Sequence, residues 1–164
     1  MPPDAADCVE VDGDAEGAAP HFRMAFPAGS EAVRQALLRL RGELPRLGLA
    51  EPEIGTAEIV LAELLNNIVE HAYDPGAEGG IELECERRKT RLVCTISDGG
   101  GPMPGDRLPE KGLAATDVAR QDLPEGGFGW FLIRELVEEL SYARQDGKNI
   151  VRFGLGLGRP ASEA

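Results

Sequence analysis

Two alternating runs, IELECER (81–87) and RLVCTIS (91–97), are the feature that most constrains how this chain can fold. Both alternate apolar and polar residues, as half-buried strands do, and only residues 88–90 separate them. They therefore predict a β-hairpin whose apolar face must be covered by other elements. Cys85 and Cys94 are expected to lie opposite each other on that buried face, where core packing is favoured over redox chemistry.

The remaining patterns supply the cover and extend the sheet. HFRMAF (21–26) alternates like a strand, Ser30 is the expected N-cap of a helix, and a second helix follows Glu51-Pro52. GWFLIRELVEEL (129–140) has helical spacing, and Asp146-Gly147 predicts a tight turn between two final strands. This order predicts an α+β fold, a two-layer sandwich in which helices cover one face of a mainly antiparallel mixed sheet.

Residues 99–127 contain many glycines and prolines and show weak periodicity. An irregular segment of this length is unusual in a compact domain unless it is a lid or a binding loop. It is the first indication of where a ligand would bind.

The composition limits the domain count and the classes of partner. A chain of 164 residues fits one domain. Residues 1–19 carry six acidic and no basic side chains and are predicted to be a disordered tail, with the domain at 20–157 and a second tail at 158–164. The formal net charge of −12 disfavours nucleic acid and anionic membranes as partners. The chain has no long apolar run and an acidic start, which indicates a cytoplasmic protein.

The helical stretch EIVLAELLNNIVEHAY (58–73) places Glu63, Asn67 and His71 along one flank of its apolar arc. A carboxylate one turn from a carboxamide suits proton acceptance from a nucleophile and oxygen ligation of a hard cation such as Mg²⁺. A solvated helix face would have the same pattern, so this stretch alone does not decide.

Two glycine-rich segments add chemistry. In TISDGGGPMPGD, Asp98 directly follows a predicted buried strand, where it can accept a hydrogen bond from an exocyclic amine while the glycines admit a flat ring; a plain turn is the alternative. In EGGFGWFLIREL, three glycines precede a helix, whose free N–H groups can bind an anion. The P-loop pattern for phosphate binding is absent from the sequence.

Taken in order, AELLNNIVEHAY, SDGGGPM and GGFGWFLI resemble the N, G1 and G2 boxes of the GHKL, or Bergerat-fold, ATPases, which share the histidine kinase-like ATPase domain. The resemblance covers residues 21–155 and is greatest to the anti-sigma-factor serine/threonine kinases. It implies a kinase that binds Mg²⁺ and ATP under a lid. The implied acceptor is an anti-sigma-factor antagonist, with a sigma factor as the alternative partner and a homodimer as a further option.

The resemblance also implies a role for individual residues. Glu63 would be the catalytic general base, Asn67 the Mg²⁺ ligand and Asp98 the group that binds the adenine amine. Gly100 would open space beside the ring, and Asn149, where a Thr is often found, would help to hold adenine through water. The glycines implied to contact phosphates through backbone N–H groups are Gly126, Gly127 and Gly129.

The lid contributes little positive charge. Lys111 or Arg120 is either a helper in phosphate neutralisation or an ordinary solvated charge. Pro102 replaces the last glycine of the usual DxGxG pattern, and Trp130 stands where Leu is common. His71 is expected to anchor the end of its helix rather than to meet substrate.

Two other functions stay open at this point. The chain could bind ATP and sequester a partner without phosphorylating it, or it could hydrolyse ATP to drive a conformational change. The first would show complex formation without a phosphoprotein, and the second steady phosphate release without a partner.

Overall fold

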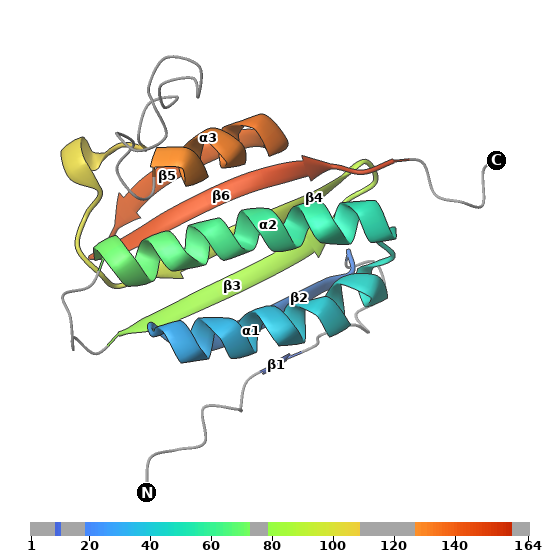
Figure 1. Ribbon diagram of the computed structural model, residues 1–164, viewed down its shortest axis with the longest axis horizontal. Helices are drawn as coiled ribbons and strands as arrows, with labels where there is room; N and C mark the ends of the chain where they lie inside the picture. The colour runs from blue at the N-terminus through green and yellow to red at the C-terminus, as the bar shows by residue number, and fades with distance from the viewer. Residues whose placement is uncertain (1–8, 11–18, 73–78, 109–126, 159–164) are drawn as a thin grey trace, which may run out of the picture.

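The computed structural model describes residues 9–10, 19–72, 79–108 and 127–158. These residues form a six-stranded sheet with three α-helices on one of its faces (Figure 1). In chain order the elements are β1 (Val9–Glu10), β2 (His21–Pro27), α1 (Ser30–Glu43), α2 (Glu51–Asn67), β3 (Gly80–Arg87), β4 (Arg91–Asp98), α3 (Gly127–Leu136), β5 (Glu138–Gln145) and β6 (Lys148–Gly156).

The strand order across the sheet is β1-β2-β3-β4-β6-β5, and every pair in the described residues is antiparallel. The predicted two-layer α+β sandwich is thus confirmed, although no parallel pair occurs in this part of the chain. Within the predicted N-terminal tail, Val9 and Glu10 pair with Met24 and Arg23 of β2. The rest of that tail up to residue 18, and residues 159–164, lie outside the described residues.

The core lies between the sheet and the helices. Alternation along β2 points Phe22, Met24 and Phe26 inward, and the helical period of α2 does the same for its leucines. Trp130 and Ile133 bring α3 into this core. Burial of this apolar surface holds the helices on the sheet and fixes the positions of both ends of α2.

The β3–β4 hairpin has the predicted register. Cys85 lies directly opposite Cys94, both side chains are fully buried, and their Sγ atoms are 3.1 Å apart. The predicted β5–β6 turn is also confirmed, since Asp146 and Gly147 both have positive φ, at 51° and 76°. This geometry is that of a two-residue type I′ hairpin turn.

Two predicted helix boundaries are wrong. The N-cap of α1 is Gly29 and not Ser30, which is the first helical residue, and no side-chain bond caps this end. The predicted helix 129–140 ends at Leu136, where Val137 N–H closes the last turn on Ile133 O at 3.0 Å. Glu138 begins an edge strand on β6, with a register shift between Glu138 and Ser141 and positive φ at Glu139. No described helix is both long and apolar enough to cross a bilayer.

Candidate functional site

The residues singled out by the sequence gather at one end of the molecule. Figure 1 shows the end of α2, the end of β4, the start of α3 and the β5–β6 turn at this end. Helix α2 packs against α3, and β4 pairs with β6 so that Asp98 lies opposite Asn149. Because antiparallel neighbours alternate in direction, the carboxyl end of β4 necessarily meets the amino end of β6.

Asn67 is the last residue of the α-helical part of α2 and is 8% exposed. Its Nδ2 has no hydrogen-bond partner among the described residues. Residues 68–72 continue as a π-helix, an element that is rare and often found at functional sites. A buried carboxamide without a partner is costly in a purely structural position, so this one is available for a ligand.

Glu63 lies one turn before Asn67 and is half-buried. Its carboxylate lies against Gly129 in the first turns of α3, so closely that a Cβ atom at Gly129 would overlap Oε2. Gly127 begins this helix, and the N–H groups of its first turn point toward the same end. Glycine at position 129 therefore allows a carboxylate to sit at a helix start.

Asp98 ends β4 and is 3% exposed. Its Oδ1 accepts hydrogen bonds from Gly100 N–H at 2.9 Å and from Asn149 Nδ2 at 3.0 Å. Within the described residues Oδ2 accepts none. The side chain is therefore held by the protein through one oxygen and offers the other.

Asn149 is also 3% exposed. Besides Asp98 it donates to Gly101 O at 2.8 Å, and its Oδ1 accepts from Tyr142 Oη at 2.6 Å and Arg144 Nη1 at 2.8 Å. Tyr142 and Arg144 were missed by the sequence analysis. The two-residue turn fixes Arg144 opposite Asn149, so the hairpin register carried a signal that could have found it.

Other predicted residues are not brought into this arrangement. Lys111, Arg120 and Gly126 lie outside the described residues. The His71 side chain is 60% exposed, and its Nε2 lies 3.6 Å from Glu70 Oε2. Because a π turn holds more residues than an α turn, His71 does not continue the line of Glu63 and Asn67.

The donor set fits a phosphate-bound magnesium ion better than a protein-caged metal. No cluster of three or more His, Cys, Asp or Glu suited to a metal occurs in the part of the chain that the structure describes. Mg²⁺ needs only one or two protein oxygens when phosphates and water complete its shell, and Asn67 Oδ1 can be one of them. The unpaired Nδ2 of the same side chain can donate to a phosphate oxygen.

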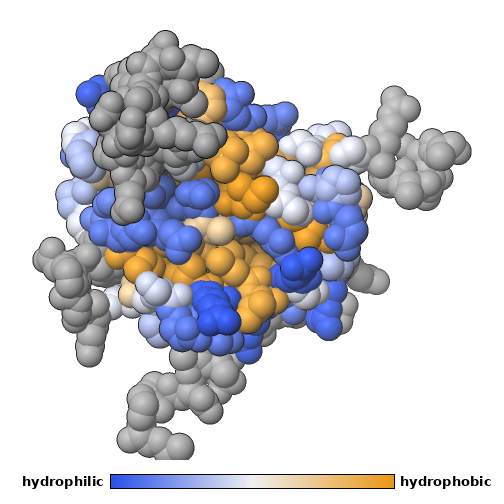
Figure 2. Space-filling model, viewed as in Figure 1, coloured by the Kyte–Doolittle hydropathy of each residue, from blue (hydrophilic) through white to orange (hydrophobic). Residues whose placement is uncertain are grey.

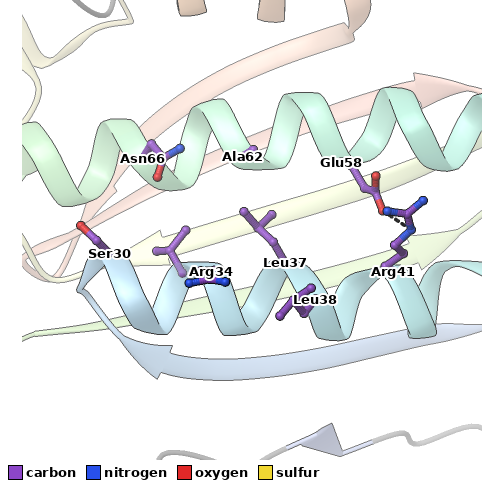
Figure 3. A pocket seen from close by; sticks show the side chains of 9 residues that line it. Ser30, Arg34, Leu37, Leu38, Arg41, Glu58, Ala62 and Asn66 are labelled. Carbon is purple, nitrogen blue, oxygen red and sulfur yellow. Dashed lines mark ion pairs between the residues drawn. The ribbon is translucent and has the colours of Figure 1, made fainter.

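Two surface grooves lie away from this arrangement. One, of about 410 Å³, runs between α1 and α2, and Figure 3 shows Leu37 and Leu38 beside the Arg41–Glu58 ion pair, with Asn66 on its wall. Figure 2 shows apolar surface gathered over this seam. The other groove is lined by residues from Ala19, Leu47, the β3–β4 turn and Leu157, at the opposite end of β4 from Asp98. Neither contains a predicted site residue.

Comparison with known proteins places this arrangement in a family. The sequence profile of the histidine kinase-like ATPase domain matches residues 26–155, most of the chain. The chain belongs to this family. The matched range includes every described residue of the candidate site, so this histidine kinase-like ATPase domain holds Asn67, Asp98 and Gly129 inside its defining fold.

Curated relatives of this histidine kinase-like ATPase domain are named serine-protein kinase RsbW. The chain is 33% identical over 128 residues to the protein from Halalkalibacterium halodurans, covering 77% of each chain. It is 28% identical over 132 residues to the protein from Bacillus thuringiensis, covering 79% of this chain and 81% of the relative. The chain is thus an RsbW-like member of the family.

A solved structure shows the same fold. The crystal structure of the RsbU and RsbW domains of a Mycobacterium tuberculosis protein superposes with a TM-score of 0.59 at 19% identity. The match covers 87% of this chain but only 34% of that one. At this identity the likeness concerns the fold.

Proposed function

We propose that the protein is a serine/threonine protein kinase of the anti-sigma-factor type. It binds Mg-ATP at the end of α2 and transfers the γ-phosphoryl group to a hydroxyl of an anti-sigma-factor antagonist. The observation that carries the proposal is the buried carboxamide of Asn67, whose amide nitrogen lacks a partner in the described residues, one turn from the Glu63 carboxylate. Family membership and the names of the relatives support the same activity.

Each residue has a physical task in this proposal. Asp98 accepts a hydrogen bond from the adenine amine through Oδ2, and Gly100 keeps the space beside the ring free. Asn67 holds the phosphate-bound Mg²⁺ through Oδ1, and when bound this ion offsets phosphate charge. Glu63 accepts the proton of the attacking hydroxyl.

Two helix segments complete the site. The first-turn N–H groups of α3 donate to phosphate oxygens, which the positive end of the helix dipole favours. The close contact of Glu63 with Gly129 keeps the base beside those N–H groups. Lys111, Arg120 and Gly126 remain proposed phosphate contacts in the segment outside the described residues.

The first prediction separates binding from transfer. We expect Glu63→Gln to keep the ATP affinity within about twofold and to reduce phosphoryl transfer at least about 100-fold, because a carboxamide cannot take the proton. Asn67→Ala should weaken Mg²⁺-dependent ATP binding at least about tenfold without lowering the melting temperature, because removing an unpaired buried donor offsets the lost packing. Calorimetry measures binding, and labelled ATP measures transfer.

Matched controls lie on the same helix. Glu58→Gln and Asn66→Ala make the same chemical changes on the side of α2 that faces α1 (Figure 3), and both should leave binding and transfer unchanged. The acceptor is captured from a lysate of the source organism by pull-down with Mg-ATP and identified by new phosphoserine or phosphothreonine in mass spectrometry. A stable complex with a captured partner but no phosphoprotein at saturating ATP would refute the kinase and support a sequestering module.

A further inference from the structure

A continuous hydrogen-bonded chain links strand β5 to the carboxylate of Asp98. Arg144 Nη1 and Tyr142 Oη both donate to Asn149 Oδ1, at 2.8 Å and 2.6 Å. Asn149 Nδ2 then donates to Asp98 Oδ1 at 3.0 Å. Asn149 and Asp98 are both 3% exposed, so the links that join them are protected from water.

The polarity of this chain can run in only one direction. A guanidinium group only donates hydrogen bonds and a carboxylate only accepts them, so the residues at the two ends fix the Asn149 amide between them. A flipped amide would place its NH₂ against the Arg144 guanidinium and its oxygen against the Asp98 carboxylate. Both contacts would be repulsive at positions where the present ones are charge-assisted.

The fixed amide decides what Asp98 presents to a ligand. Asn149 Nδ2 and Gly100 N–H both occupy Oδ1, while Oδ2 accepts no bond from a described residue. Both bonds also prevent rotation of the carboxylate. Oδ2 is therefore a fixed acceptor that can satisfy a donor and must leave a carbonyl oxygen unpaired or repelled.

The same two β5 residues also hold the backbone that follows Asp98. Arg144 Nη1 donates to Gly100 O at 3.1 Å, and Met103 N–H donates to Tyr142 Oη at 3.2 Å. Arg144 and Tyr142 thus orient both the Asp98 carboxylate, through Asn149, and the segment beside it. Their own side chains do not need to touch a ligand for this.

We propose that Arg144, assisted by Tyr142, is a positioning residue that sets the base specificity of the nucleotide site. By fixing Asn149 it makes Asp98 a pure acceptor, which selects a purine with an exocyclic amine at C6 over one with a carbonyl there. This inference rests on the proposed function, since it assumes that Asp98 faces the base. It adds to that function the physical origin of adenine selectivity.

The test compares ATP with inosine triphosphate, which carries a carbonyl at C6, by calorimetry on the full chain with Mg²⁺. The wild-type protein should prefer ATP. Arg144→Met should lose about tenfold in ATP affinity and less in inosine triphosphate affinity, so that the preference falls. Arg144→Lys keeps a donor-only cation and should restore most of the preference.

Two further variants guard the interpretation. Arg152→Met removes the same charge from β6 on the opposite face of the sheet from Asn149, and it should change neither affinity. Tyr142→Phe removes the other donor to Asn149 and should also lower the preference, which keeps the test valid if Arg144→Met does not fold. Melting temperatures report folding for every variant.

The outcomes separate the two proposals. A folded wild-type protein that binds neither nucleotide would refute the proposed function and this inference with it. A wild-type preference for ATP that Arg144→Met and Tyr142→Phe both retain would refute the inference alone. Equal loss of both nucleotides would also overturn it, because that result indicates a structural role without selectivity.

Discussion

At the scale of single residues, Gly129 and Glu63 show how a small side chain makes room for a functional one. Gly129 is buried in α3, and its Cα is covered by the Glu63 carboxylate from α2. Its backbone is helical, so an alanine there would otherwise be favourable. The contact with Glu63 is therefore the physical reason for glycine at this position.

A double-mutant cycle tests this contact. Gly129→Ala should lower the free energy of unfolding by about 1–3 kcal/mol, as overpacking does, because the added Cβ overlaps Glu63 Oε2. In a Glu63→Ala background the same change should be neutral or stabilise by up to about 1 kcal/mol, since only helix propensity remains. Urea unfolding measures all four proteins. Equal costs in both backgrounds would show that Glu63 does not occupy this space.

At the scale of elements, the β5–β6 hairpin positions the residues that hold Asp98. Its turn requires positive φ at Asp146 and Gly147, and its register places Arg144 opposite Asn149. The local geometry of two turn residues thus controls an interaction network several residues away. The edge position of β5 leaves this register dependent on the turn and on one neighbouring strand.

Two glycine substitutions should have opposite effects. Gly147→Ala should lower the free energy of unfolding by about 1 kcal/mol or more, because its φ of 76° strains an L-residue. Gly55→Ala, within α2 where an added Cβ meets open space, should raise it by about 0.5–1 kcal/mol. Thermal and urea unfolding compare the two. A stabilising Gly147→Ala would refute the turn geometry.

At the scale of the whole molecule, the Cys85–Cys94 pair reports on the integrity of the sandwich. Both thiols lie in the centre of the sheet beneath the helices, with no exposed surface. Burial, followed by the hydrogen bond with Cys94, raises the pKa of the Cys85 thiol well above its usual value. The folded protein therefore holds this proton to a higher pH than the unfolded chain does.

This difference predicts how stability depends on pH. Above the ordinary thiol pKa of about 8.5 the unfolded state binds fewer protons than the folded state, so the free energy of unfolding falls as pH rises. The contribution of Cys85 is complete below that pH and is lost by at most about 1.4 kcal/mol per pH unit above it.

Urea unfolding from pH 7 to 10, with a reductant present, measures the slope. The double variant Cys85→Ala/Cys94→Ala should be less stable at pH 7 but should lose less stability on the alkaline side. If both proteins have parallel pH profiles, the thiols are not what the alkaline limb reports.

Much of the fold follows from local patterns in the sequence. The hairpin at 81–97, the turn at Asp146-Gly147 and the buried arc of α2 were predictable, because period and turn chemistry are encoded in neighbouring residues. The predicted helix through Leu140 was wrong for the same reason. Leu136, Val137 and Leu140 keep a helical spacing, but pairing with β6 makes the second half of this stretch a strand.

The sequence by itself determined the chemical types at the site and their order along the chain, since a carboxylate, a carboxamide and glycines at these spacings are properties of the chain alone. Only the tertiary structure decided that Asn67 is buried without a partner, that Glu63 lies against Gly129, and that Arg144 acts on Asp98 through Asn149. Those features arise where segments from 35 to 66 residues apart pack together, and local periodicity carries no information about such contacts.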